Sequence, residues 1–438
     1  MIINNTLCNP KTFLVLLDCI FEEIITIQEI FYNSCSSGNI ELVNLLMMLG
    51  LFEPSAFNNS EIQLASQYGH IAVVDRLLQD GRVDPSAYDN DAIRVASKYG
   101  RIAVVDRLLQ DSRVDPSADN NYAIRISSYH GHIAVVERLL QDRRVDPSAD
   151  DNYAIRMASE NGHIAVVERL LQDRRVDPST DNNYAIRIAS KNGHIVVVDS
   201  LLQDPRVDPS AAFNFAIRWA SNNGHVTVVD RLLQEDRSNN RVDPSDIDNY
   251  AIGVASENGH IAVVDRLLQG GRVDPSADDN YAIRWASENG HVAVVDRLLQ
   301  DGRVDPSADD NYAIRWASEN GHIAVVDRLL QESKNRVDPS ADNNYAIRWA
   351  SGNGHVAVVD RLLQDSRVDP AVNNNEAIRW SSQHGHIAVV ERLLQDRRVD
   401  PSADNNYAIR YASEYGHIAV VDRLLQDGRV APQHFHKM

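Results

Sequence analysis

The sequence predicts an all-α solenoid of about 13 helix-loop-helix units, joined by short or irregular hairpin loops. Three observations support this fold class. A glycine-centred motif returns at a nearly constant interval, two short amphipathic helical patterns flank it, and a proline follows most of these helix pairs. A solenoid grows by adding units, so the two or three globular domains usual for 438 residues are not expected.

The repeat is marked by the pair Gly-His or a close variant of it. Successive glycines are 31 residues apart, except for intervals of 35 residues before Gly259 and 33 residues before Gly354. The 13 motif glycines are Gly38, Gly69, Gly100, Gly131, Gly162, Gly193, Gly224, Gly259, Gly290, Gly321, Gly354, Gly385 and Gly416.

The first helix of a unit is illustrated by residues 311–320. Ala313 and Ala317 lie four residues apart, as on one face of a helix. Asp310 or Asn311 precedes this pattern, and we expect its side-chain oxygen to cap the first backbone N–H groups. Gly321 ends the helix, because glycine adopts the left-handed conformation of a C-terminal cap at little cost.

The second helix of the same unit carries its own apolar stripe. Ile323, Val326 and Leu330 fall at i, i+3 and i+7. Prolines such as Pro306 lie between successive units and prevent the helix from continuing. One unit buries too little apolar surface to fold alone, so neighbouring units must cover each other's apolar faces.

The order of these segments resembles the ankyrin repeat. The likeness is closest at Gly321–Leu330, G-H-I-A-V-V-D-R-L-L, and it extends from about Glu29 to Val430. The first helix departs from the family, with Y-A-I-R-W-A at Tyr312–Ala317 where ankyrins usually show T-P-L-H-x-A. The unit is also two residues shorter than usual, and we expect the loss to fall in the hairpin.

The phrase N-Y-A-I-R-W-A-S-E-N-G-H is similar to ankyrin arrays of large DNA viruses that infect amoebae. The ankyrin resemblance implies a right-handed stack with a concave binding face and other proteins as partners. The viral resemblance adds the host cell's proteins as those partners and its cytoplasm as the location.

Charge and composition exclude several classes of partner. The chain has 43 basic and 62 acidic residues, a net charge of −19, which repels nucleic acids and anionic membrane surfaces. No apolar run approaches the length of a membrane span. The three cysteines, Cys8, Cys19 and Cys35, form neither a disulfide framework nor a zinc motif, so we expect reduced thiols in the cytoplasm or the nucleus, with the cytoplasm as the predicted location.

Three kinds of side chain recur in register with the repeat. Histidines follow 11 of the repeat glycines, and we expect them to link adjacent units, because stacked helices hold equivalent side chains too far apart for zinc. Tryptophans share one position of the first helix with other apolar residues, which predicts core between repeats. They are Trp219, Trp285, Trp316, Trp349 and Trp380.

Arginines form a ladder along the first helices. It has two interpretations: a surface for an acidic partner, or pairing with the many loop aspartates, which the negative net charge favours. The positions are Arg94, Arg125, Arg156, Arg187, Arg218, Arg284, Arg315, Arg348, Arg379 and Arg410.

Departures from the repeat pattern cluster in two adjacent units, 211–254. Aromatic or aliphatic residues replace loop Asp or Asn residues there, a junction gains four residues within 235–240, and Gly253 replaces a ladder arginine. Such changes indicate either a partner-binding site on loop tips or tolerated drift in a loop that accepts insertions easily. The candidate partner-binding residues are Phe213, Asn214, Phe215, Asn222, Asn223 and Ile247. A second insertion, Glu332–Asn335, lacks aromatic residues.

The expected organisation is a capping helical segment at 1–28, a repeat array at 29–430 and a short tail at 431–438. The last unit hardly differs from the interior ones, so we expect an uncapped apolar face there that frays or associates with another molecule.

These observations favour a scaffold or adaptor that binds proteins through loop tips and a concave face. The alternative is a structural or elastic spacer, because nearly identical units offer a poorly discriminating surface. An enzyme is not expected, because carboxylates and histidines recur identically and no catalytic set, phosphate-binding loop, cofactor site or metal site stands out.

Overall fold

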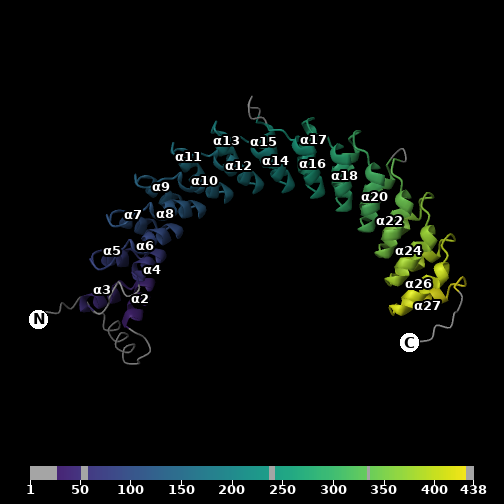
Figure 1. Cartoon of the computed structure of the whole chain (residues 1–438), viewed down its shortest axis with the longest axis horizontal. Helices are drawn as coiled ribbons and strands as arrows, with labels where there is room; N and C mark the ends of the chain where they lie inside the picture. Colours follow the sequence, from purple (N-terminus) through teal and green to yellow (C-terminus); the bar gives the residue numbers. More distant parts are fainter. Residues whose placement is uncertain (1–26, 51–57, 236–241, 333–335, 431–438) are drawn as a thin grey trace. The chain divides into compact units, whose positions relative to one another are not determined.

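The computed structural model describes residues 27–50, 58–235, 242–332 and 336–430. These residues form 26 α-helices in 13 successive pairs, without any strand, which confirms the predicted all-α repeat fold (Figure 1). The chain divides into two compact units, Met1–Ala211 and Ala212–Met438, which are described separately here.

The first unit holds six pairs, most of them a first helix of about 12 residues and a second of about 8. They are α2 (Ile27–Ser37), α3 (Ile40–Leu49), α4 (Ser60–Tyr68), α5 (Ile71–Leu78), α6 (Ala87–Lys98), α7 (Ile102–Leu109), α8 (Ala118–Tyr129), α9 (Ile133–Leu140), α10 (Ala149–Glu160), α11 (Ile164–Leu171), α12 (Thr180–Lys191) and α13 (Ile195–Leu202).

The second unit holds seven pairs and begins within α14, one residue after its start. Its helices are α14 (Ala211–Asn222), α15 (Val226–Leu233), α16 (Asp246–Glu257), α17 (Ile261–Gln269), α18 (Ala277–Glu288), α19 (Val292–Leu299), α20 (Ala308–Glu319), α21 (Ile323–Leu330), α22 (Ala341–Gly352), α23 (Val356–Leu362), α24 (Val372–Gln383), α25 (Ile387–Leu394), α26 (Ala403–Glu414) and α27 (Ile418–Leu425).

Each unit is held together by contacts between neighbouring pairs. In the second unit, α16 packs on α18 and α18 on α20, while α17 packs on α19 and α19 on α21. The apolar stripes read from the sequence supply the core: Ala282 and Ile283 of α18 and Val294, Val295 and Leu298 of α19 are buried. The core is therefore a continuous seam between repeats.

The start of each first helix differs from the expected cap. In α20, Asp310 and Asn311 have φ angles of 51° and 62°, within a left-handed turn that Asp309 begins, and neither caps the helix. Instead, the Asn311 Oδ1 accepts the backbone N–H of Asp338 in the next repeat at 2.7 Å. The cap prediction is wrong because Asp and Asn are also the residues that best tolerate left-handed backbone.

The loop between pairs is a compact turn in place of a hairpin. In the loop before α18, the Asp274 Oδ1 accepts the backbone N–H of Ser276 at 3.0 Å and its hydroxyl at 2.7 Å. The backbone N–H of Asp274 donates to the Asn249 Oδ1 of the preceding repeat at 2.7 Å. The side chains of the short loop thus fasten it to its neighbour, which accounts for the short repeat length.

The Gly-His pair joins consecutive repeats, as expected. The His194 Nε2 donates to the Glu160 carbonyl at 3.0 Å, and its ring lies against Gly162. In the described part of the chain, no group of three or more His, Cys, Asp or Glu residues could hold a metal ion. The histidines in these pairs are structural.

The tryptophans are less buried than predicted. All five are partly exposed, and three of them, Trp285, Trp316 and Trp349, alternate with tyrosines in a row of rings along the first helices of the second unit. The Tyr312 and Trp316 rings, for example, have centroids 5.4 Å apart. The predicted packing between repeats is present, for example between Trp285 and Tyr312, but burial is incomplete because small Ala and Ser residues fill the tightest positions between first helices.

The ends of the array are described in part. The expected cap at 1–28 and the expected tail at 431–438 lie almost wholly outside the described residues. The first described helix is α2, which begins at Ile27. On the last helix, α27, Ile418 is 72% exposed and Leu425 is 47% exposed, whereas the equivalent Leu299 of α19 is 7% exposed. The expected apolar face at the C-terminal repeat is present.

Candidate partner-binding surface

Most of the ladder arginines pair with a carboxylate of the next repeat, which supports the second of their two interpretations. The aspartate position that faces Arg187 and Arg218 instead holds Ala212 and Ile247. Arg284 of α18 contacts the Asp309 carboxylate of the next repeat at 2.9 Å, and its guanidinium lies 5.2 Å from the centre of the Tyr312 ring. Equivalent ion pairs join Arg94 to Asp119, Arg125 to Asp150, Arg156 to Asp181, Arg315 to Asp342 and Arg379 to Asp404. Arg348 instead pairs with Glu376, which stands at the tyrosine position of its repeat.

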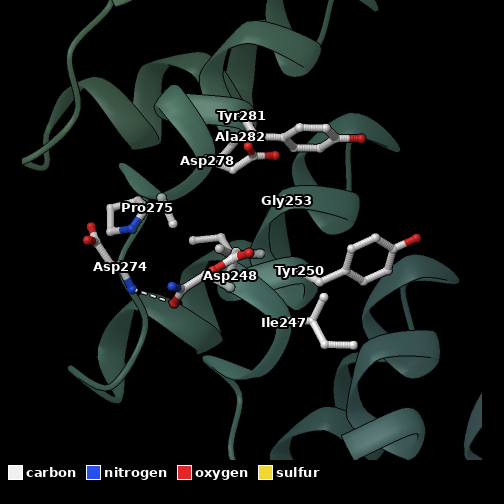
Figure 2. Close-up of a pocket in the computed structure, with 12 residues that line it drawn as sticks. Ile247, Asp248, Tyr250, Gly253, Asp274, Pro275, Asp278, Tyr281 and Ala282 are labelled. Atoms are coloured by element: carbon white, nitrogen blue, oxygen red, sulfur yellow. Dashed lines mark hydrogen bonds between the residues drawn. The ribbon is translucent and has the colours of Figure 1, made fainter. Parts of the chain in front are cut away.

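The ladder is interrupted in α16, where Gly253 stands at the arginine position. A cavity of about 190 Å³ opens there between α16 and α18. Figure 2 shows Tyr250 and Tyr281, from these two helices, on either side of Gly253. The residues that line this Gly253 slot are Ile247, Asp248, Asn249, Tyr250, Ile252, Gly253, Asp274, Pro275, Ala277, Asp278, Tyr281 and Ala282.

Of the two tyrosines that line the slot, Tyr281 is held by a hydrogen bond. The Tyr281 hydroxyl donates to Glu257 at 2.7 Å, and burial together with this carboxylate raises the pKa of Tyr281 well above its ordinary value. A Cβ atom on Gly253 would lie 2.9 Å from the Tyr281 ring, so the absence of a side chain brings the ring closer to α16.

The rim of the slot is acidic. The aspartate that an arginine at position 253 would meet is Asp278, which is exposed and pairs with no cation among the described residues. Asp274 also lines the slot, and its carboxylate accepts hydrogen bonds from Ser276, which lower the pKa of Asp274. The slot therefore combines apolar walls with an acidic rim.

Two of the candidate partner-binding residues lie at neighbouring loop tips. Phe213 is 72% exposed and Ile247, which also lines the slot, is 44% exposed. The Asn214 Nδ2 donates to the Asp246 carboxylate at 2.9 Å, so a direct bond joins the residues next to them. The two apolar tips and the slot form one region, the α14–α16 loop surface.

These tips adopt a backbone that does not suit their side chains. Phe213 and Ile247 have φ angles of 57° and 51°, in left-handed turns where other repeats place mostly Asp or Asn. A β-branched residue such as Ile247 is uncommon there, and left-handed backbone costs a non-glycine residue roughly 1–2 kcal/mol. The apolar side chains at these two tips therefore lower the stability of their turns.

The other candidate residues are placed differently. Asn214 is buried, and its Oδ1 accepts the backbone N–H of Asp243 at 2.8 Å, a structural role that the equivalent asparagines of other repeats, such as Asn183 and Asn280, share. Phe215 is half-buried against Trp219, with ring centroids 5.5 Å apart. The structure thus gives both residues internal contacts.

Asn222 and Asn223 end α14, roughly 12 Å of helix away from Phe213. The Asn222 carbonyl accepts the His260 Nε2–H at 3.0 Å, as part of the link between repeats. These two residues do not join the α14–α16 loop surface. The expected four-residue insertion lies almost wholly outside the described residues.

Sequence reasoning found Gly253 but missed Asp278 and Tyr281, because both match the repeat pattern of their own unit. They differ from the equivalent residues of other repeats only because the preceding repeat has Gly253 in place of the ladder arginine. The spacing of the ladder could have identified Asp278, because a ladder arginine pairs with the aspartate 25 residues later in the chain, as Arg284 does with Asp309.

Comparison with protein families decides which repeat this is. The model described as ankyrin repeats (3 copies) matches residues 121–213, 217–310, 283–374, 314–405 and 347–433, well over half of the chain. The chain belongs to the ankyrin repeat family. Ankyrin repeats are generally protein-interaction modules, and their all-helical arrays are typically non-enzymatic.

This ankyrin array departs from its family at the hairpins, which left-handed turns replace in the described residues. None of the curated proteins compared with it matches the chain. Among the described helices of the array, none combines the length and the apolar composition that crossing a bilayer requires.

Proposed function

We propose that the chain is a non-enzymatic scaffold that binds a protein partner at the α14–α16 loop surface. One observation carries the proposal: Phe213 and Ile247 expose apolar side chains on adjacent tips, in backbone that disfavours both residues. Exposed apolar anchors beside a cavity are typical of binding hot spots. The concave face implied by the family would supply further contacts.

The proposal extends to where the protein acts. The resemblance to ankyrin arrays of viruses that infect amoebae supports host proteins as partners and the host cytoplasm as the location. The free, buried Cys35 is compatible with a reducing compartment. The net charge of −19 favours a basic partner surface and disfavours nucleic acid and anionic membranes.

The test restores the repeat pattern at the two tips. The double variant Phe213→Asn, Ile247→Asp should lose partners that crosslinking and mass spectrometry identify for the full chain. The control is Tyr88→Asp, which removes another exposed loop-tip aromatic, 59% exposed, in the first unit. Partner capture should survive in the control.

Equal capture by the double variant and the parent chain would refute the proposal and favour the spacer interpretation. A spacer tolerates surface changes and responds to the number of repeats, so deletion of one interior repeat is the complementary variant. Association through the exposed Ile418 remains a separate prediction, checked by the oligomeric state of Ile418→Glu.

A further inference from the structure

The intact ladder shows what the Gly253 slot would otherwise contain. Around the Arg284 guanidinium, three groups converge: the Asp309 carboxylate at 2.9 Å, the Asp278 backbone carbonyl at 3.0 Å and the face of Tyr312 at 5.2 Å. The same three kinds of contact recur at Arg94, Arg125, Arg156, Arg315 and Arg379.

The counterparts of all three groups surround Gly253. The carbonyl lies 6 residues before the ladder position and the carboxylate 25 residues after it, and the ring follows three residues later. Counted from Gly253, these residues are Ile247, Asp278 and Tyr281, and all of them line the cavity. The slot therefore has the counterparts of the groups that hold a ladder arginine, with the Tyr281 ring closer to α16.

We propose that the Gly253 slot binds an arginine side chain supplied by the partner protein. The guanidinium of this arginine pairs with Asp278, donates to the Ile247 carbonyl and stacks on Tyr281, as the chain's own arginines do in other repeats. The inference rests on the proposed function and names the chemistry of its partner: a segment with an exposed arginine.

The shape and charge of the slot favour arginine over other side chains. A planar guanidinium can pair with a carboxylate and stack on a ring together, whereas an ammonium is a compact point charge. The apolar walls at Ile252 and Pro275 suit the methylene stem of the arginine, and the carboxylates of Asp248 and Asp274 add to the attraction.

The probe is the peptide acetyl-Gly-Arg-Gly-amide, titrated into the full chain and followed by saturation-transfer NMR. The citrulline peptide, which keeps the shape and loses the charge, and the lysine peptide are the comparisons. We expect saturable binding of the arginine peptide, weaker binding of the lysine peptide and none of the citrulline peptide.

Two variants of the slot test its occupancy. Asp278→Asn, a residue that the equivalent Asn373 already shows to be tolerated, should weaken arginine binding about fivefold. Gly253→Arg should abolish it by filling the slot in cis, with the Tyr281 ring shifting to admit the new Cβ atom. The matched control is Asp150→Asn, where a resident Arg125 already occupies the site, and it should leave binding unchanged.

A gain of binding gives an independent check. Arg284→Gly should open a second slot, formed by Asp309, Tyr312 and the Asp278 carbonyl, and raise the number of bound peptides from one to two. Equal weakening in Asp278→Asn and Asp150→Asn would overturn the proposal, since it would show only diffuse attraction to an acidic chain.

The two proposals fail in different ways. If the tip variants at Phe213 and Ile247 lose the protein partner while Asp278→Asn retains it, the scaffold role stands and the arginine site is wrong. If arginine peptides bind the slot but no partner depends on the tips, the site stands and the proposed function is wrong.

Discussion

The His194 imidazole lies directly against the backbone of Gly162 in the preceding repeat. A Cβ atom on Gly162 would come within 2.7 Å of the His194 Nδ1, and Gly162 has a φ angle of 75°. The glycine is therefore required twice, once for the left-handed end of its own helix and once for the ring of the next repeat.

Gly162→Ala should destabilise the chain by more than left-handed strain alone, which costs roughly 1–2 kcal/mol. The matched control is Gly416→Ala, because Gly416 has a φ angle of 76° and no atom near its missing Cβ. Denaturant unfolding should show the larger loss for Gly162→Ala. Equal losses would mean that the His194 contact yields without cost.

The buried asparagine of the left-handed turn should matter through its side chain. Asn280→Gly tolerates the φ angle of 61° but removes the oxygen that accepts the Asp305 backbone N–H at 2.7 Å. We expect a loss of about 1 kcal/mol, because a part-buried backbone donor remains without its partner. Asp279→Gly, at the exposed neighbouring position, should change stability by less than about 0.5 kcal/mol in urea titrations.

The apolar tip at Phe213 should lower stability. Phe213→Asn places a residue that tolerates left-handed backbone at φ 57°, and we expect a gain of about 1 kcal/mol in unfolding free energy. The reciprocal variant Asn182→Phe, at the equivalent turn of the first unit, should lose a similar amount. A destabilised Phe213→Asn would show that the ring has a structural role.

Loop carboxylates should make the array sensitive to acid. Hydrogen bonds from Arg144 lower the pKa of Asp142 below its ordinary value of 3.8, and Arg144 also donates to the Val114 carbonyl of the preceding repeat at 2.7 Å. The pair therefore stabilises the folded chain above pH 3.8, and this contribution is lost as the pH falls through the lowered pKa.

Asp142→Asn should reduce stability at pH 7 and flatten its decline between pH 5 and about 2, measured by unfolding at each pH. Asp151→Asn, a change at an exposed turn position, serves as the comparison and should keep the parent profile. Identical profiles for both variants and the parent would contradict the assignment to Asp142.

The helix pairs could be predicted from the sequence because apolar spacing and Gly321-type helix ends depend on local rules. The left-handed turn could not, since Asp310 and Asn311 suit a cap and a left-handed backbone equally well. The slot at Gly253 was missed for another reason. Its groups come from two repeats, and the residues that matter in the second repeat, Asp278 and Tyr281, are unremarkable in their own unit.

The ladder has an evolutionary consequence. A ladder arginine such as Arg284 occupies a site formed by a carboxylate, a carbonyl and a ring from two neighbouring repeats. Such a site could bind an arginine of another protein if its own arginine were absent. Changing one codon, as at Gly253, is enough to vacate such a site while leaving its walls intact. A repeat array of this kind can therefore gain an arginine-binding site by a single substitution in any repeat where the groups that form the site are already present.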